Sequence, residues 1–159
     1  MFRSLRRNKT STSGLTTSQL FDHVTFYDSF LKDISQAKEQ VIIESPFLTT
    51  RRVSMILPAL VRLKRRGVKI VINTRDSLEQ EGHMRSEAEL SIKLLQSAGM
   101  SILFTGGHHR KLAIIDREVL WEGSLNILSQ NDSCEIMRRT ASARIAEDLI
   151  SFIKLEAYL

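Results

Sequence analysis

An alternation between two hydrophobic patterns over residues 26–104 restricts the possible folds more than any other feature of the sequence. Segments whose apolar residues recur every three or four positions alternate with short continuous apolar runs. Helices are expected at 26–40, 52–66 and 86–98, and strands at 41–43, 68–73 and 100–104. This order is typical of parallel strands joined by crossover helices. Pro58 lies inside the second helical segment, so we expect that helix to start later or to kink there.

The pattern changes after residue 104. Two short strands are expected at 111–115 and 119–122, joined by a turn over 116–118, and a further strand is expected at 134–140. Residues 143–158 carry the apolar stripe of a closing amphipathic helix. No internal repeat is visible. We therefore predict the α/β class, with a mixed, largely parallel central sheet flanked by helices.

The length of 159 residues predicts one domain. Residues 1–20 are rich in serine and threonine, contain no acid, and are expected to form a flexible basic arm, which leaves 21–159 as the domain. No apolar run is long enough to span a membrane, and the arm lacks the apolar stretch of a secretory signal. Its composition also resembles a transit peptide. With a single cysteine in the chain, we expect no internal disulfide and favour a cytoplasmic protein.

The net charge of +5 says little about partners, because most of it belongs to the arm and the rest of the chain has 19 basic against 18 acidic residues. The positions of the charges are more informative. Arg51, Arg52 and Arg75 each follow the end of a predicted parallel strand, where open α/β sheets bind ligands, and are candidate contacts to flanking phosphates. The basic run at 62–66 is explained by favourable interaction with the end of a helix.

Residues 106–139 contain the side chains best suited to chemistry. His109 and Lys111 are two residues apart at the start of a predicted strand, so their side chains point to the same face. Ser124 and Asn126 follow the next strand and offer a hydroxyl and an amide as hydrogen-bond donors. Glu135 is suited to accept the proton of the second imidazole nitrogen and so to fix the tautomer. These are the parts that phosphoryl transfer requires when no metal takes part.

This segment resembles the phospholipase D superfamily. The HxK(x)4D motif of that superfamily is matched by His109, Lys111 and Asp116, its GSxN element by Gly123, Ser124 and Asn126, and its later acid by Glu135. Residues 41–47 and 66–73 also look like the first two strands of the same domain, so the resemblance covers about residues 21–159.

The resemblance implies a two-step reaction with catalytic residues His109, Lys111, Asp116, Ser124, Asn126 and Glu135. One histidine attacks phosphorus to give a phosphohistidine, and a second histidine, from a second copy of the motif, protonates the leaving oxygen before water hydrolyses the intermediate. Lys111 and Asn126 would hold phosphate oxygens with support from Ser124, and Glu135 would orient the imidazole. The role implied for Asp116 is structural and electrostatic rather than proton transfer. No metal and no other cofactor is expected.

The chain contains one copy of the motif. Superfamily members of this length pair two chains so that both motifs face one pocket, so we predict a C2 homodimer. The alternative is a nuclease domain that belongs to a larger helicase or restriction protein. The leading function is a metal-independent DNA endonuclease without stable membrane association. The alternatives are a lipid phosphodiesterase or phosphatidyl transferase, and a non-catalytic nucleic-acid-binding module that kept the fold.

Three further residues have simpler interpretations. His108 is adjacent to His109 on a strand, so the two rings should point to opposite faces and not share a metal. Cys134 is expected to be a small buried apolar residue, with no second cysteine to pair with. Trp121 is expected to pack in the core or in an interface.

Overall fold

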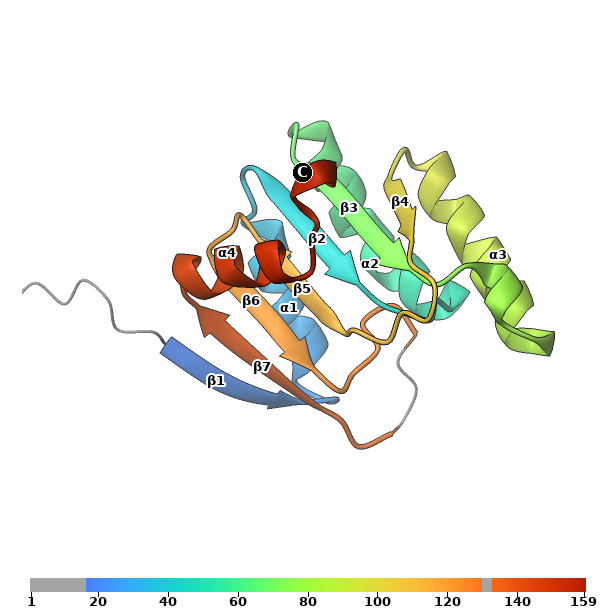
Figure 1. Ribbon diagram of the computed structural model, residues 1–159, viewed down its shortest axis with the longest axis horizontal. Helices are drawn as coiled ribbons and strands as arrows, with labels where there is room; N and C mark the ends of the chain where they lie inside the picture. The colour runs from blue at the N-terminus through green and yellow to red at the C-terminus, as the bar shows by residue number, and fades with distance from the viewer. Residues whose placement is uncertain (1–16, 130–132) are drawn as a thin grey trace, which may run out of the picture.

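A seven-stranded mixed sheet separates two layers of helices in the computed structural model, which describes residues 17–129 and 133–159. The strands are β1 (Thr17–Asp22), β2 (Gln40–Glu44), β3 (Lys69–Thr74), β4 (Ser101–Phe104), β5 (Leu112–Ile115), β6 (Val119–Gly123) and β7 (Ile136–Ala141). The helices are α1 (Phe26–Ser35), α2 (Thr50–Arg65), α3 (Gly82–Ser97) and α4 (Ala143–Phe152), with 3-10 turns η1 (Ser77–Glu79) and η2 (Glu156–Tyr158). Figure 1 shows α4 in front of the sheet and α1 and α2 behind it.

The strand order is β1-β7-β6-β5-β2-β3-β4. Only β2, β3 and β4 pair in parallel, whereas β5, β6, β7 and β1 form an antiparallel half next to β2. The mixed α/β architecture is confirmed, but the sheet is less parallel than expected. The reason lies in the connections: the turn between β5 and β6 has only a few residues, and a connection this short joins antiparallel strands alone.

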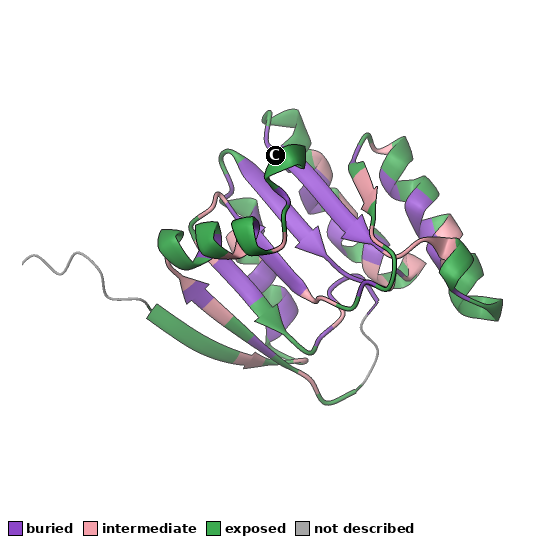
Figure 2. Ribbon diagram, in the orientation of Figure 1, coloured by how far each residue is buried: buried purple, intermediate pink, exposed green. Residues whose placement is uncertain are grey.

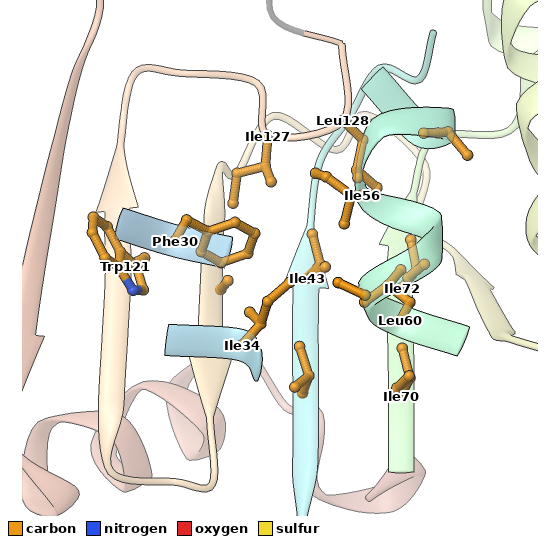
Figure 3. Close-up of a cluster of buried hydrophobic side chains, with 14 of the residues drawn as sticks. Phe30, Ile34, Ile43, Ile56, Leu60, Ile70, Ile72, Trp121, Ile127 and Leu128 are labelled. Atoms are coloured by element: carbon orange, nitrogen blue, oxygen red, sulfur yellow. The ribbon is translucent and has the colours of Figure 1, made fainter. Parts of the chain in front are cut away.

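The central strands are buried on both faces, which explains their continuous apolar runs. On β2, Val41 and Ile43 face a large core shared with α1, α2 and α3, while Ile42 faces a smaller core under α4. Figure 2 shows the buried residues concentrated on β2, β3 and β5. Figure 3 shows the larger core, with Trp121 and Phe30 at one end and Leu60 and Ile72 at the other. The predicted core position of Trp121 is confirmed, since the side chain is fully buried.

The N-terminal edge strand β1 was not predicted. It pairs antiparallel with β7, from Thr17 opposite Ala141 to Asp22 opposite Ile136. Assigning residues 17–20 to a flexible arm was therefore wrong, and the remainder of the expected arm, 1–16, lies outside the described residues. The strand could not be predicted because its exposed residues show no alternation of apolar and polar side chains. Main-chain hydrogen bonds to β7 hold it in place.

All four helices differ from their predicted bounds. α1 ends at Ser35 rather than at residue 40, and α3 begins at Gly82 rather than at residue 86. α2 begins after Thr49, whose hydroxyl accepts a hydrogen bond from Arg52 N at 3.4 Å, and continues through Pro58 without a later start. α4 ends at Phe152, because Lys154 adopts a left-handed backbone conformation with φ 58° and the chain continues into η2. A single helix over 143–158 was therefore wrong.

Candidate active site

The strand directions bring the segments with the predicted catalytic residues to one edge of the sheet (Figure 1). This edge holds the carboxyl ends of β2, β3, β4 and β6 and the amino ends of β5 and β7. His109 and Lys111 precede β5, Ser124 and Asn126 follow β6, and Glu135 precedes β7. Since neighbouring strands lie about 4.8 Å apart, the segments on either side of β6 are separated by about 10 Å.

Main-chain hydrogen bonds fix these segments relative to one another. Gly123 N donates to Lys111 O at 3.2 Å, and Ser124 N donates to Ile136 O at 3.0 Å. Gly123 has no room for a side chain, because a Cβ atom would lie 2.1 Å from Ile136 O. The glycine of the GSxN element therefore allows β6 and β7 to approach closely just below the site.

The cation of the motif lies beside the exposed histidine. The Lys111 ammonium donates a hydrogen bond to the main-chain oxygen of His109 at 2.9 Å, and Lys111 itself is half-buried. A positive charge held here favours the approach of an anionic oxygen to the imidazole. Glu135, also half-buried, accepts a hydrogen bond from the Ser133 hydroxyl at 3.0 Å.

Ser124 and Asn126 differ in how their polar atoms are used. Ser124 Oγ accepts a hydrogen bond from Ile136 N at 3.1 Å, so the serine closes the β6–β7 connection and keeps its own proton available for donation. Asn126 Oδ1 is buried and has no hydrogen-bond partner within the part of the chain that the structure describes. An unpaired buried amide oxygen is costly, because it has lost its hydrogen bonds to water.

The segment that carries Asn126 is fastened to the loop after β2. Leu128 N donates to Ser45 Oγ at 3.1 Å, and the Tyr27 hydroxyl donates to Ile127 O at 3.0 Å. Burial raises the pKa of Tyr27 to about 12, so this donor keeps its proton at neutral pH. Tyr27 and Ser45 carry no signal in the sequence, because both contacts join residues that are far apart in the chain.

Asp116, the last residue of the HxK(x)4D motif, lies at the opposite edge of the sheet. It follows β5, about 16 Å from Lys111 by the rise of an extended strand. Its carboxylate accepts hydrogen bonds from Lys38 N, Glu39 N and Gln40 N at 2.8, 2.8 and 3.0 Å. These contacts agree with the structural role implied for Asp116, and the distance from Lys111 argues against its place in the catalytic set.

The three candidate phosphate-binding arginines lie at the same edge as the motif. Arg51 and Arg52 are in the first turn of α2, and Arg75 follows β3. Two of them already have partners: the Arg52 guanidinium lies 4.3 Å from the centre of the Tyr27 ring, and Arg75 Nε donates to Glu79 Oε2 at 3.1 Å. Contact of these arginines with substrate remains a prediction.

His108 and Cys134 take different environments. His108 is almost fully buried, and desolvation lowers its pKa, so the ring is neutral at neutral pH. Cys134 is exposed, which corrects the expectation of a buried residue. It borders an open hollow of about 450 Å³ that also includes Ser124, Leu20 and Ile136. Among residues 17–129 and 133–159, no three His, Cys, Asp or Glu side chains cluster as metal ligands would.

Comparisons with known proteins identify the family and the fold. Residues 30–154 match the model of the family described as "Cardiolipin synthase, PLD-like domain". No curated protein sequence gives a significant match. In the portion of the chain that is described, no helix is both long and apolar enough to cross a membrane.

Solved structures of several proteins share the fold. Nuc, a phospholipase D family member from Salmonella typhimurium, is 18% identical with a TM-score of 0.70, over 87% of this chain and 91% of that one. NucT from Helicobacter pylori is 22% identical with a TM-score of 0.67, over 88% and 94% of the two chains. Phosphatidylserine synthase from Haemophilus influenzae is 13% identical with a TM-score of 0.63, over 91% of this chain and 38% of that one. Since the family model covers most of the chain and the fold agrees, the chain belongs to the phospholipase D superfamily, in the family described as the PLD-like domain of cardiolipin synthase.

Proposed function

We propose that the chain is a phosphodiesterase that cleaves DNA through a covalent intermediate on His109 and needs no metal ion. The observation that carries the proposal is the convergence of His109 and Lys111, Ser124 and Asn126, and Glu135 on one edge of the sheet. A nucleophile, a cation, neutral donors and a carboxylate at one edge can bind and attack a phosphate.

The proposed reaction has two steps. An imidazole nitrogen of His109 forms a bond to phosphorus while the ester P–O bond breaks, and the leaving oxygen takes a proton from a second imidazolium. Water then gives its proton to that second imidazole as its oxygen attacks phosphorus, and the P–N bond breaks to release the phosphate and free His109. Lys111 and Asn126 hold the phosphate oxygens in both steps, and Glu135 orients an imidazole.

The second imidazole is His109 of the partner subunit in a C2 homodimer. This part of the proposal is supported by the single copy of the motif and by the position of His108, which is buried against β3. An isologous interface uses the same patch of both subunits, and a residue of that patch near the two-fold axis faces its own copy. We expect sedimentation of micromolar protein to give the mass of a dimer, and an active protein that is strictly monomeric would contradict this step.

DNA is favoured over lipid as the substrate because Arg51, Arg52 and Arg75 lie beside the motif, where they can contact neighbouring phosphates of a polyanion. A cytoplasmic location remains a prediction from the sequence. The second candidate is transfer or hydrolysis of a lipid phosphodiester. It is supported by the family description, which names cardiolipin synthase, and by the similarity to a phosphatidylserine synthase.

Supercoiled plasmid incubated with the protein in excess EDTA tests the proposal. We expect nicking by the wild type and by His83→Ala, a control at an exposed histidine, and none by His109→Ala. Nicking by the wild type that occurs without EDTA and disappears when EDTA is added would contradict metal independence. Hydrolysis of phosphatidylcholine vesicles without nicking would support the lipid candidate, and retention of plasmid on a gel without cleavage would support a binding module.

A further inference from the structure

A buried ion pair joins the end of β2 to the residue between the two motif positions. Glu44, the last residue of β2, is completely buried. Arg110 lies between His109 and Lys111, and its Nε donates to Glu44 Oε2 while its Nη2 donates to Oε1 at 2.9 Å. Two parallel hydrogen bonds from a guanidinium fix its direction as well as its distance. They also raise the pKa of Arg110, so its charge is permanent.

The carboxylate in this pair is itself held by the ends of the neighbouring strands. Asn73 Nδ2, on β3, donates to Glu44 Oε1 at 2.8 Å. The Thr105 hydroxyl, directly after β4, donates to Asn73 Oδ1 at 3.0 Å. Thr105 therefore orients the Asn73 amide, and the Asn73 amide orients the Glu44 carboxylate. In this way the carboxyl ends of β2, β3 and β4 together hold Glu44 in one position.

His108 adds a second attachment on the other side of His109. Arg110 N donates to His108 Nδ1 at 3.3 Å, so the proton of the neutral ring is on Nε2. His108 Nε2 then donates to Asn73 O at 3.3 Å. The residues before and after His109 are therefore both fastened to the ends of β2 and β3, while His109 itself is exposed.

This attachment matters because residues 105–111 belong to no helix or strand. The repeated hydrogen bonds of a sheet therefore do not hold the backbone of His109. A buried ion pair is in general weak evidence for stability, because the cost of removing both charges from water offsets their attraction. The Glu44 carboxylate is fully buried, and its donors are Arg110 Nε and Nη2 from this loop and Asn73 Nδ2 from β3. A requirement for one loop conformation explains this arrangement better than stability does.

We propose that Glu44 is a positioning residue that acts through Arg110 to hold His109 and Lys111 in the geometry for attack on phosphorus. The proposal rests on the proposed phosphodiesterase function. Glu44 touches neither substrate nor the reacting atoms. Its loss should lower kcat, since a displacement of about 1 Å at a reacting group can cost roughly 100-fold in rate. The change in KM should be smaller than the change in kcat, because the hydrogen bond from Gly123 N still ties Lys111 to β6 and Asn126 lies outside the loop that Arg110 fixes.

The test compares Glu44→Gln and Arg110→Lys with Asp33→Asn. Asp33 provides a matched control because Arg139 Nε and Nη2 donate to its two oxygens at 2.6 and 3.2 Å, near Asp116 at the far edge of the sheet. With bis(p-nitrophenyl) phosphate as the substrate, we expect kcat to fall about 100-fold in Glu44→Gln. Arg110→Lys, which keeps the charge but not the paired hydrogen bonds, should be intermediate. Asp33→Asn should keep the wild-type kcat even where its thermal midpoint falls.

Hydrogen exchange across residues 105–111 supplies a readout that needs no activity. Both variants of the ion pair should exchange faster there, and Asp33→Asn should not. If the wild type hydrolyses no phosphodiester, the proposed function fails and exchange alone decides whether the ion pair holds the loop. A Glu44→Gln enzyme with wild-type kcat, or unchanged exchange in 105–111, would overturn the proposal. If Glu44→Gln does not fold, Arg110→Lys carries both measurements.

Discussion

Replacement of Asp116 by alanine distinguishes a structural from a catalytic role for the last residue of the motif. In the structure, its carboxylate accepts hydrogen bonds from the main-chain N–H groups of Lys38 and Glu39, in the loop before β2, and of Gln40, the first residue of β2. Its backbone has φ 51°, and Arg117 has φ 55°, as required by the tight turn between β5 and β6. The substitution therefore removes three hydrogen bonds and places alanine in a left-handed conformation.

The expected loss of stability is moderate because water reaches part of the site. A hydrogen bond to a charged group contributes about 1.5–3 kcal/mol when buried, and two of the three donors belong to the exposed residues Lys38 and Glu39, so we take about 2 kcal/mol for the set. The left-handed backbone adds about 1 kcal/mol for alanine. A total of about 3 kcal/mol should lower Tm by roughly 6–12 °C in a chain of this size.

Urea unfolding and kinetics on one preparation provide the assay. Asp116→Ala should unfold at lower urea concentration yet retain the wild-type kcat at a temperature where it is folded. Asp116→Asn keeps one acceptor oxygen and tolerates the backbone conformation, so it should lose about half as much stability. A fall in kcat of about 100-fold with an unchanged unfolding midpoint would show instead that Asp116 is catalytic.

Three further predictions concern the residues that support the site. Because burial lowers the pKa of His108, the unfolded chain binds a proton below about pH 6.5 that the folded chain does not. The free energy of unfolding should therefore fall as the pH is lowered from about 7.5 to about 5.5, and His108→Gln should flatten this dependence. An equally steep pH dependence in His108→Gln would contradict the prediction. Tyr27 should ionise only near pH 12 in an absorbance titration, and ionisation of Tyr27 near pH 10 would show that its hydroxyl is exposed. Tyr27→Phe should lower the free energy of unfolding in urea by about 1 kcal/mol, because it removes the hydrogen bond to Ile127 O. Trp121 is buried and its Nε1 donates to Asp33 Oδ2 at 2.9 Å, so its fluorescence should be blue-shifted and protected from acrylamide. Ready quenching by acrylamide would contradict its burial. Trp121→Phe should lower the free energy of unfolding by about 2 kcal/mol.

The predictions that succeeded depend on local signals. The helix and strand order over residues 26–104 follows from hydrophobic periodicity, which each segment expresses by itself. The approach of Lys111 to Ser124 follows from a short hairpin, because a tight turn brings the beginning of one strand beside the end of the next.

The features that were missed depend on contacts between distant parts of the chain. β1 is a polar edge strand whose only signal is its pairing with β7, more than a hundred residues later. β5 lies antiparallel beside β2, which no pattern within either strand indicates. Glu44 and Arg110 are separated by 66 residues, and a carboxylate at the end of an apolar strand does not by itself indicate its partner.

Mass spectrometry of protein quenched during turnover shows directly whether His109 is the nucleophile. With a phosphodiester substrate in excess EDTA, we expect a phosphoryl adduct on the imidazole of His109, absent from His109→Ala. Turnover without an adduct at residue 109, or an adduct on another residue with His109→Ala fully active, would contradict it.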